Sequence, residues 1–259
     1  MNASKAPTIY LGYQPNSRCR GTLTHGPRAI AGDGAPAILV AFPQLQEFLR
    51  RDRLEVRVRS YCVDSGAFSV WNTGATVDLE AYVRVCQHLL STDELLEEVF
   101  ALDDIASWRT TVRNTERMWA AGVPAIPTFH IGEPEEVLVG LSRDYPKVGI
   151  GGIARLRGTS RQRFAEQVFA RVWPKRLHGF GVSTRDMLLS LPWHSTDATS
   201  WETGPGAFGR WRSFGGRRLS VRGSQQDLRR EVQWYLDLER LAQHRWAKEL
   251  SEVSDSEAF

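Results

Sequence analysis

Acidic residues lie at the end of, or within, three short runs of β-branched and apolar residues. Asp64 ends VRVRSYCVD, Asp103 and Asp104 end VFALDD, and Asp197 lies within WHSTDAT. Two carboxylates that converge on one site suit chemistry at the anomeric carbon of a sugar, because one can attack as a nucleophile while the other moves a proton. A third carboxylate nearby would raise the pKa of its neighbours unless a donor-rich ligand paired with it.

Guanine is such a donor-rich ligand. Its ring N–H and its exocyclic amine point the same way, so one aspartate can accept hydrogen bonds from both. Backbone N–H groups at Gly151 and Gly152 would meet the carbonyl oxygen, since glycine permits a close approach of the backbone. A guanine-like base beside an anomeric carbon would therefore suit these residues.

Each carboxylate also has a purely structural interpretation. Asp64 precedes Ser-Gly and could cap a turn, and Asp197 could belong to a turn in which neighbouring hydroxyl groups bond the backbone. Asp104 could cap the following helix, and we prefer Asp103 for the site because of its place in the run.

The histidines and glycines have ordinary alternatives as well. We expect His130, His178 and His194 near the same rim, but a lone histidine beside a strand is more often structural than catalytic, so only His130 is a candidate. A Gly-Gly turn after a strand is common in any β/α protein.

The elements that must position these residues follow a repeating pattern. Eight β-like runs are separated by amphipathic stretches: TIYLGY, ILVAF, VRVRSYCVD, VFALDD, PAIPTFHIG, VGIGGIA, LHGFGV and WHSTDAT. This alternation predicts an α/β fold, a (β/α)₈ TIM-type barrel, whose active site lies at the C-terminal ends of the strands. The acidic residues, His130 and the Gly-Gly pair would then face one rim.

Helix signals fill most of the gaps between these runs. VDLEAYVRVCQHLL follows Asp78, and SWRTTVRNTERMWAAG begins near Ser107 and stops at Gly122, so both segments have capping residues. Further helices are predicted at GEPEEVLVGLSR, TSRQRFAEQVFARVW, TRDMLLSL and QQDLRREVQWYLDLERLAQHRWAKEL. We expect a barrel domain over residues 1–201, with a basic segment and a C-terminal helix packed on it over residues 202–259.

Composition sets the cellular context that we expect. The 259 residues are 42% hydrophobic and 24% charged, as in ordinary folded proteins. No apolar run has the length of a signal peptide or membrane span, which predicts a cytoplasmic protein without a membrane partner. Three cysteines far apart, Cys19, Cys62 and Cys86, favour reduced thiols over a disulfide framework.

A basic, aromatic segment lies between Trp201 and Arg230. It could meet phosphates and stack on bases, or it could be a solvated Gly-rich loop whose aromatic residues cover the barrel floor. Of the nine tryptophans, Trp201 and Trp211 are the better candidates for base contact. The candidate nucleic-acid-binding residues are Trp201, Arg210, Trp211, Arg212, Arg217 and Arg218.

Four short motifs, in this order, resemble those of the tRNA-guanine transglycosylases. VDSGAFS resembles the family's Asp-Ser-Gly-Gly-Phe-Gln motif, FALDD its Ala-Phe-Asp-Glu segment and GIGGIA its Gly-Gly-Leu-Ala segment, while STDATSW takes the place of the strand that carries the nucleophile. The resemblance spans Thr8 to about Trp201 and is closer still to the DpdA-type deazaguanine DNA transglycosylases of phages and bacteria.

This resemblance implies a base exchange that retains configuration. Asp197 would attack the anomeric carbon and expel guanine, leaving a covalent glycosyl-enzyme, and Asp64 would take a proton from the incoming base. Asp103 would read the guanine-like edge, which a 7-deazaguanine keeps, and His130 falls near a glutamine of the tRNA enzymes. The implied base-binding residues are Ser65, Phe68, Asp103, His130, Gly151 and Gly152.

One departure from the family bears on the substrate. The tRNA enzymes carry a Cys-rich zinc subdomain after the nucleophile, whereas no cysteine follows Cys86 here, so neither zinc nor another cofactor is predicted. The Arg/Trp segment in its place favours DNA over tRNA, in a bacterial or phage-infected cell, with a helper ATPase as a conceivable partner because a paired base must be extruded. A tRNA enzyme, a catalytically silent nucleic-acid-binding subunit and an unrelated nucleoside hydrolase remain alternatives.

Overall fold

The computed structural model describes residues 6–15, 34–51, 57–67, 76–201, 210–212, 218–220 and 225–256. Side chains are described in these ranges except at 210–212, 218–220, 225–227 and 252–256. Eight strands form one sheet: β1 (Thr8–Gly12), β2 (Ala37–Ala41), β3 (Ser60–Asp64), β4 (Leu96–Val99), β5 (Thr128–His130), β6 (Lys147–Gly151), β7 (Arg176–Gly179) and β8 (Ser195–Ala198).

The sheet is parallel throughout and curls until its two edges meet. Its strand order is β4-β3-β2-β1-β8-β7-β6-β5, so β4 and β5 are the edges. They join through a single parallel bridge between Phe100 and Ile126, at which the Ala101 N–H donates to the Ile126 carbonyl and the Ile126 N–H to the Val99 carbonyl, both at 2.8 Å. The expected TIM-type (β/α)₈ fold is therefore confirmed, with one narrow seam.

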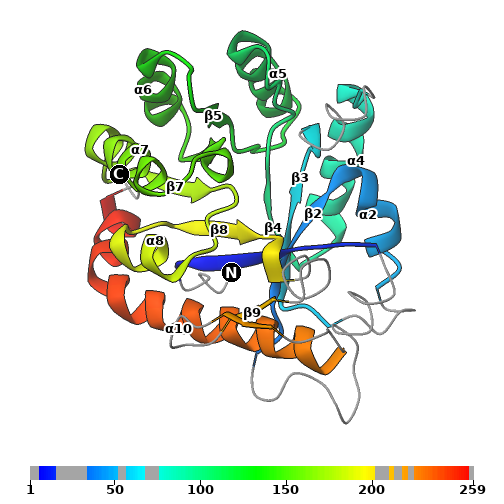
Figure 1. The fold of residues 1–259 in the computed structure, drawn as a ribbon. Helices are drawn as coiled ribbons and strands as arrows, with labels where there is room; N and C mark the ends of the chain where they lie inside the picture. The colour runs from blue at the N-terminus through cyan, green and yellow to red at the C-terminus, as the bar shows by residue number, and fades with distance from the viewer. Residues whose placement is uncertain are drawn as a thin grey trace.

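Helices surround the strands (Figure 1). They are α2 (Phe42–Phe48), α4 (Leu79–Thr92), α5 (Trp108–Ala120), α6 (Glu135–Asp144), α7 (Thr159–Val172), α8 (Arg185–Ser190) and the 3-10 turn η1 (Ile153–Arg155). The two predicted caps are confirmed: the side chain of Asp78 accepts from the Ala81 N–H, and that of Ser107 accepts from the Thr110 N–H. Helix α5 ends just before Gly122, whose φ of 78° suits glycine.

The long C-terminal helix α10 (Gln225–Ser256) lies along the barrel beside β1 and α8 (Figure 1). Glu239 anchors it, because its buried Oε2 accepts hydrogen bonds from the Ile9 N–H and from Arg59 Nη2, both at 2.7 Å. The predicted basic segment contributes a small antiparallel ribbon of β9 (Arg210–Arg212) and β10 (Arg218–Ser220), and β9 contacts α10.

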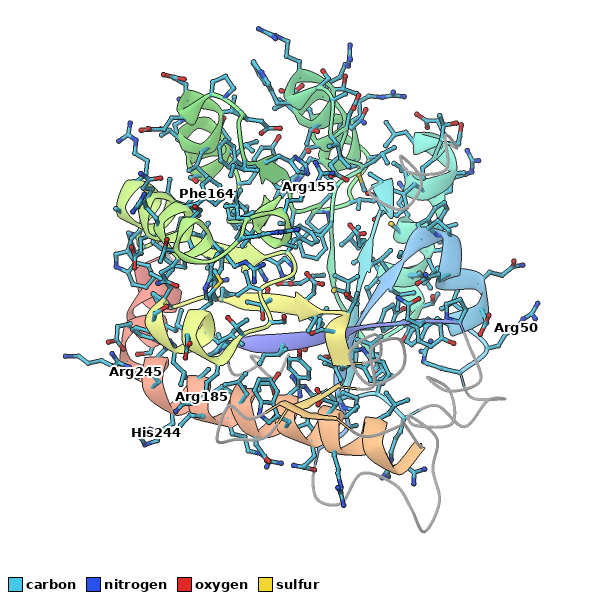
Figure 2. All side chains as sticks on the ribbon, in the orientation of Figure 1. Arg50, Arg155, Phe164, Arg185, His244 and Arg245 are labelled. Atoms are coloured by element: carbon cyan, nitrogen blue, oxygen red, sulfur yellow. The ribbon has the colours of Figure 1, made fainter. Side chains whose placement is uncertain are left out.

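Among the described residues, two apolar clusters pack against the barrel strands, and a third lies along the C-terminal half of α10. The larger fills the space between the strands and the helices. The smaller lies inside the barrel and consists of Tyr10, Ala37, Leu39, Cys62, Phe100 and Ile126, with Phe180 against it. Figure 2 shows Arg50, in the turn after α2, and His244 and Arg245, on α10, projecting outward. Among the described helices, none is long and apolar enough to cross a membrane.

One strand differs from the expectation. The run VFALDD was expected to be the fourth strand, but β4 ends at Val99 and Phe100 contributes only the bridge. The register of β4 against β3 shifts between Tyr61 and Cys62. Both Glu97 and Glu98 consequently reach the Tyr10 hydroxyl inside the barrel, at 2.9 and 3.4 Å. A search for apolar runs misses this strand, because half of its residues are acidic, and it cannot reveal the register shift.

Candidate active site

A cavity of about 370 Å³ opens at the C-terminal end of the barrel. Residues at the end of every strand line it, from Gly12 and Tyr13 after β1 to Asp197 and Thr199 at β8. Its volume is in the range of small-molecule sites. The predicted residues Asp64, Asp103, His130, Gly151, Gly152 and Asp197 all line this cavity.

Asp64 lies at the end of β3, and its environment favours the protonated form. Its Oδ2 accepts a hydrogen bond from the Gly66 N–H at 3.1 Å, so the turn-capping interpretation is also correct. Burial first, and then the negative charge of Asp103, raise the pKa of Asp64 to about 7, with a smaller contribution from Asp197. A carboxyl group of this kind can give and take a proton near neutral pH.

Asp103, in the loop after β4, is held through both of its oxygens. The buried Ser65 hydroxyl donates to Oδ1 at 2.9 Å, and His130 Nε2 lies 3.1 Å from Oδ2. Its neighbour Asp104 instead accepts from the Ala106 N–H in a local turn and does not line the cavity. These contacts fix the orientation of the Asp103 carboxylate.

His130 lies between two carboxylates. Its Nδ1 is 3.4 Å from Glu133 Oε1, on the side opposite Asp103. Burial lowers the pKa of His130, but the contacts with Asp103 and Glu133 outweigh it and raise the pKa to about 9. At neutral pH the imidazole ring is therefore positively charged, which a glutamine at this position could not be.

The Gly-Gly pair makes room for this arrangement. A Cβ atom on Gly151 would lie 2.5 Å from Cδ2 of the His130 ring, so a side chain there would displace the ring. Gly152 has a φ of 85°, and a Cβ atom on it would lie 2.5 Å from the Ile131 side chain. Both positions require glycine for steric reasons, in addition to lining the cavity.

Asp197 lies on β8 across the cavity and is only 7% exposed. Its Oδ1 accepts a hydrogen bond from the Gly181 N–H at 2.7 Å and lies 3.6 Å from His178 Nε2. Within the described part of the chain, no hydrogen bond is made to Oδ2. One oxygen of the carboxylate is thus held, and the other is left for a ligand.

Two histidines expected at the rim lie elsewhere. His178, in β7, is completely buried inside the barrel below Asp197, and His194 precedes β8 at the opposite end of the barrel. Burial is the main reason that the pKa values of both are lowered, that of His194 to about 3. The expectation was wrong for two reasons. The His178 side chain points into the barrel interior, one layer of side chains below Asp197, and His194 precedes its strand instead of following it.

The predicted nucleic-acid-binding residues are only partly described. Phe68 and Arg217 lie outside the described residues, and Arg210, Trp211, Arg212 and Arg218 lie in β9 and β10, whose side chains are not described. Trp201 is a correction: it is fully buried, and its indole N–H donates to the Gly12 carbonyl at 3.0 Å. It belongs to the larger apolar cluster and, with no exposed surface, cannot stack on a base.

Sequence reasoning missed several polar residues. Glu133 follows His130 by three positions, and that spacing was the available signal. Lys147 and Glu98 form an ion pair inside the barrel, where a charged residue in an otherwise apolar strand was the signal. Across the described ranges, no group of three or more His, Cys, Asp or Glu side chains is arranged to hold a metal ion.

Comparisons with known proteins bear on the fold. No family model and no curated protein matches the sequence. Among solved structures, a variant of the tryptophan synthase alpha-subunit from Pyrococcus furiosus is similar with a TM-score of 0.50 and 12% identity, over 89% of this chain and 97% of that one. Two further variants of that subunit have TM-scores of 0.49 at the same identity and coverage. A likeness at this identity supports the barrel class alone.

Proposed function

We propose that the protein is a guanine transglycosylase that exchanges guanine in DNA for a 7-deazaguanine base, such as the 7-cyano derivative. The observation that carries the proposal is the convergence of three carboxylates in different environments on one cavity. Asp197 has an oxygen free for attack, Asp64 has a pKa of about 7, and Asp103 is fixed by Ser65 and His130. This division suits a nucleophile, a proton carrier and a base-recognition group.

In the first half of the reaction, Asp197 Oδ2 forms a bond to C1′ of the nucleotide. The bond between C1′ and N9 of guanine breaks, its electron pair leaves with the base, and protonated Asp64 supplies a proton to the departing guanine. In the second half, ionised Asp64 removes the proton from the corresponding nitrogen of the incoming base. That nitrogen attacks C1′ and releases Asp197, so two displacements retain the configuration.

Asp103 recognises both the leaving and the incoming base. Ser65 and His130 approach its two oxygens, and the remaining lone pairs can accept the ring N–H and the exocyclic amine of guanine. A 7-deazaguanine has the same donors on that edge, so one pocket serves both. The positive charge on His130 balances Asp103 in the cavity, which limits the repulsion between Asp103 and the other two carboxylates.

The choice of DNA rests on the sequence. The stretch between Trp201 and Arg230 is rich in arginine and glycine, and it stands where the tRNA enzymes carry a zinc subdomain. A reaction on DNA would place the protein in the cytoplasm of a bacterial or phage-infected cell. Opening the duplex costs a few kcal/mol per extruded base, which a helper ATPase could supply.

Base exchange tests the proposal. Purified protein is incubated with labelled guanine or 7-cyano-7-deazaguanine and with duplex DNA, single-stranded DNA or tRNA, and the digested nucleosides are analysed by mass spectrometry. We expect label in DNA with the wild type and none with Asp197→Asn, which keeps the size of the side chain. Label in tRNA alone would support the chemistry and overturn the DNA substrate, and release of base without incorporation would identify a hydrolase. No label in any nucleic acid, with or without a duplex-opening ATPase, would contradict the proposal.

A further inference from the structure

A file of polar side chains runs through the inside of the barrel beneath the cavity. It starts at Glu98 on β4, passes through Lys147 on β6, Ser195 on β8 and His178 on β7, and ends at Asp197. Lys147, Ser195 and His178 are at most 5% exposed. Burying a polar group without a partner costs free energy, so each buried donor here should have an acceptor. That requirement fixes which atom donates in each hydrogen bond.

Lys147 determines the direction at the start of the file. Its Nζ lies 2.5 and 2.7 Å from the two carboxylate oxygens of Glu98 and 2.7 Å from Ser195 Oγ, so its three protons have three acceptors. Ser195 Oγ therefore accepts from Lys147. Its own proton points to His178 Nδ1, which lies 2.8 Å away.

The protonation state of His178 follows from this direction. Because Nδ1 accepts from Ser195, the neutral ring carries its proton on Nε2, the nitrogen that faces Asp197 Oδ1 at 3.6 Å. In the opposite tautomer, Lys147 and His178 would both donate to Ser195, and a bare lone pair would face a carboxylate. Within the described residues Nε2 makes no hydrogen bond, and the one acceptor that faces it is Asp197.

The surroundings of His178 keep the ring neutral. The rings of Phe100, Phe180 and Tyr10 lie around it, with centroids 4.6, 4.5 and 6.3 Å away. Burial and the positive charge of Lys147 oppose protonation, whereas Asp197 and Glu98 favour it, and the net effect lowers the pKa of His178. A neutral ring can donate from Nε2 without forming a full ion pair with Asp197.

We propose that this file of donors, from Lys147 through Ser195 to His178, positions Asp197 by engaging Oδ1 together with the Gly181 N–H, so that Oδ2 alone is the reacting oxygen. The 3.6 Å between His178 Nε2 and Asp197 Oδ1 is longer than a hydrogen bond. In the proposal this distance shortens to a hydrogen bond when a ligand binds. Ser195 and His178 are thus positioning residues. The tautomer is a property of the free protein, and the role of Oδ2 rests on the proposed function.

Nitrogen NMR of histidine tests the tautomer without any substrate. Two-bond ¹⁵N–¹H correlation spectra of ¹⁵N-histidine-labelled protein distinguish the two neutral tautomers and the imidazolium, and His178→Gln identifies the resonances. We expect the Nε2–H form in the wild type and a loss of that fixed form in Ser195→Ala. Ser60→Ala is the matched control, because Ser60 is also buried at the start of a strand but, among the described residues, its hydroxyl has no hydrogen-bond partner.

Kinetics then tests the role in positioning. In base exchange, we expect Ser195→Ala to lower kcat on the order of 10- to 100-fold with little change in KM for the base, and Ser60→Ala to leave both unchanged. An Nδ1–H form or an imidazolium in the wild type would overturn the proposal, as would a Ser195→Ala protein equal to Ser60→Ala in spectrum and kcat. If Ser195→Ala does not fold, the wild-type spectrum still decides. If the spectrum is as expected but no base is exchanged, the tautomer stands and the proposed function fails.

Discussion

His130 Nε2 lies 3.1 Å from Asp103 Oδ2, and the two residues come from the loops and strand ends on either side of the barrel seam. The pair therefore joins the edge strands β4 and β5 above the single bridge between Phe100 and Ile126. It also sets the charge of the cavity, because the imidazolium offsets one of the three carboxylates.

Replacing His130 should change both stability and recognition. The pKa of His130 is about 9 in the folded protein against about 6.5 in an unfolded chain, so its contribution to stability is complete below pH 6.5 and is lost as the pH rises through 9. His130→Gln should thus be less stable than the wild type at pH 6, and the difference should shrink by pH 9.5. Denaturant unfolding at the two pH values measures this, and KM for the base should rise more than kcat falls. A pH-independent stability difference would contradict the assignment.

Asp64→Asn should lower the activity and raise the stability of the protein at pH 8. The pKa of Asp64 is raised to about 7, so the stability associated with its protonation is present below pH 4 and is lost as the pH rises through 7. Asparagine removes that loss and still accepts from the Gly66 N–H. We expect a more stable protein at pH 8, by about 1 to 3 kcal/mol, and no such gain at pH 4. Base exchange should fall at least about 100-fold. A variant less stable than the wild type at pH 8 would show that the ionised Asp64 carboxylate does not destabilise the fold.

Gly151→Ala should disrupt the site and leave the barrel intact. The added methyl group would lie 2.5 Å from the His130 ring, which must move away from Asp103. We expect weaker base binding, measured as a higher KM, while the circular dichroism spectrum stays unchanged. Gly140→Ala is the control: it lies in α6, where an added Cβ atom meets nothing beyond its own helix backbone within 4 Å, and it should stabilise by about 0.5 to 1 kcal/mol. Equal activity in the two variants would refute the steric role of Gly151.

Trp201→Phe should affect stability and spare nucleic-acid binding. The indole N–H donates to the buried Gly12 carbonyl, and losing this hydrogen bond should cost about 0.5 to 1.5 kcal/mol. Trp173→Phe is a suitable comparison, because that side chain is 41% exposed and its replacement should cost little. Thermal unfolding and salt-dependent DNA binding, measured side by side, separate the two effects. Reduced DNA affinity in a stably folded Trp201→Phe would restore the original expectation.

Most of the barrel was readable from the sequence, because alternation of apolar strands and capped helices is a local signal. The caps at Asp78 and Ser107 are examples, since each is determined within four residues. The start of β4 was not readable, because its Leu-Glu-Glu-Val sequence places two glutamates in a strand, and only the interior partners Tyr10 and Lys147 explain them.

The candidate site was readable in part for the same reason. Asp64, Asp103, His130 and Asp197 end or follow strands, and the barrel brings all strand ends to one cavity. The file through Lys147, Ser195 and His178 depends on contacts between residues 17 to 49 positions apart, which only the closed barrel creates. Trp201 was misjudged because an aromatic residue next to a basic segment can face either the solvent or the core.

The single bridge makes the seam between β4 and β5 the place where the barrel can open locally most easily. Among the described residues, the backbone hydrogen bonds at this bridge are those donated by the Ala101 and Ile126 amides, and the Asp103–His130 pair joins the same two edges above it. A base bound to Asp103 would stabilise the Asp103–His130 contact across the seam. Hydrogen exchange at the Ala101 and Ile126 amides would then slow when a base binds, so these two amide protons would report whether the pocket is occupied.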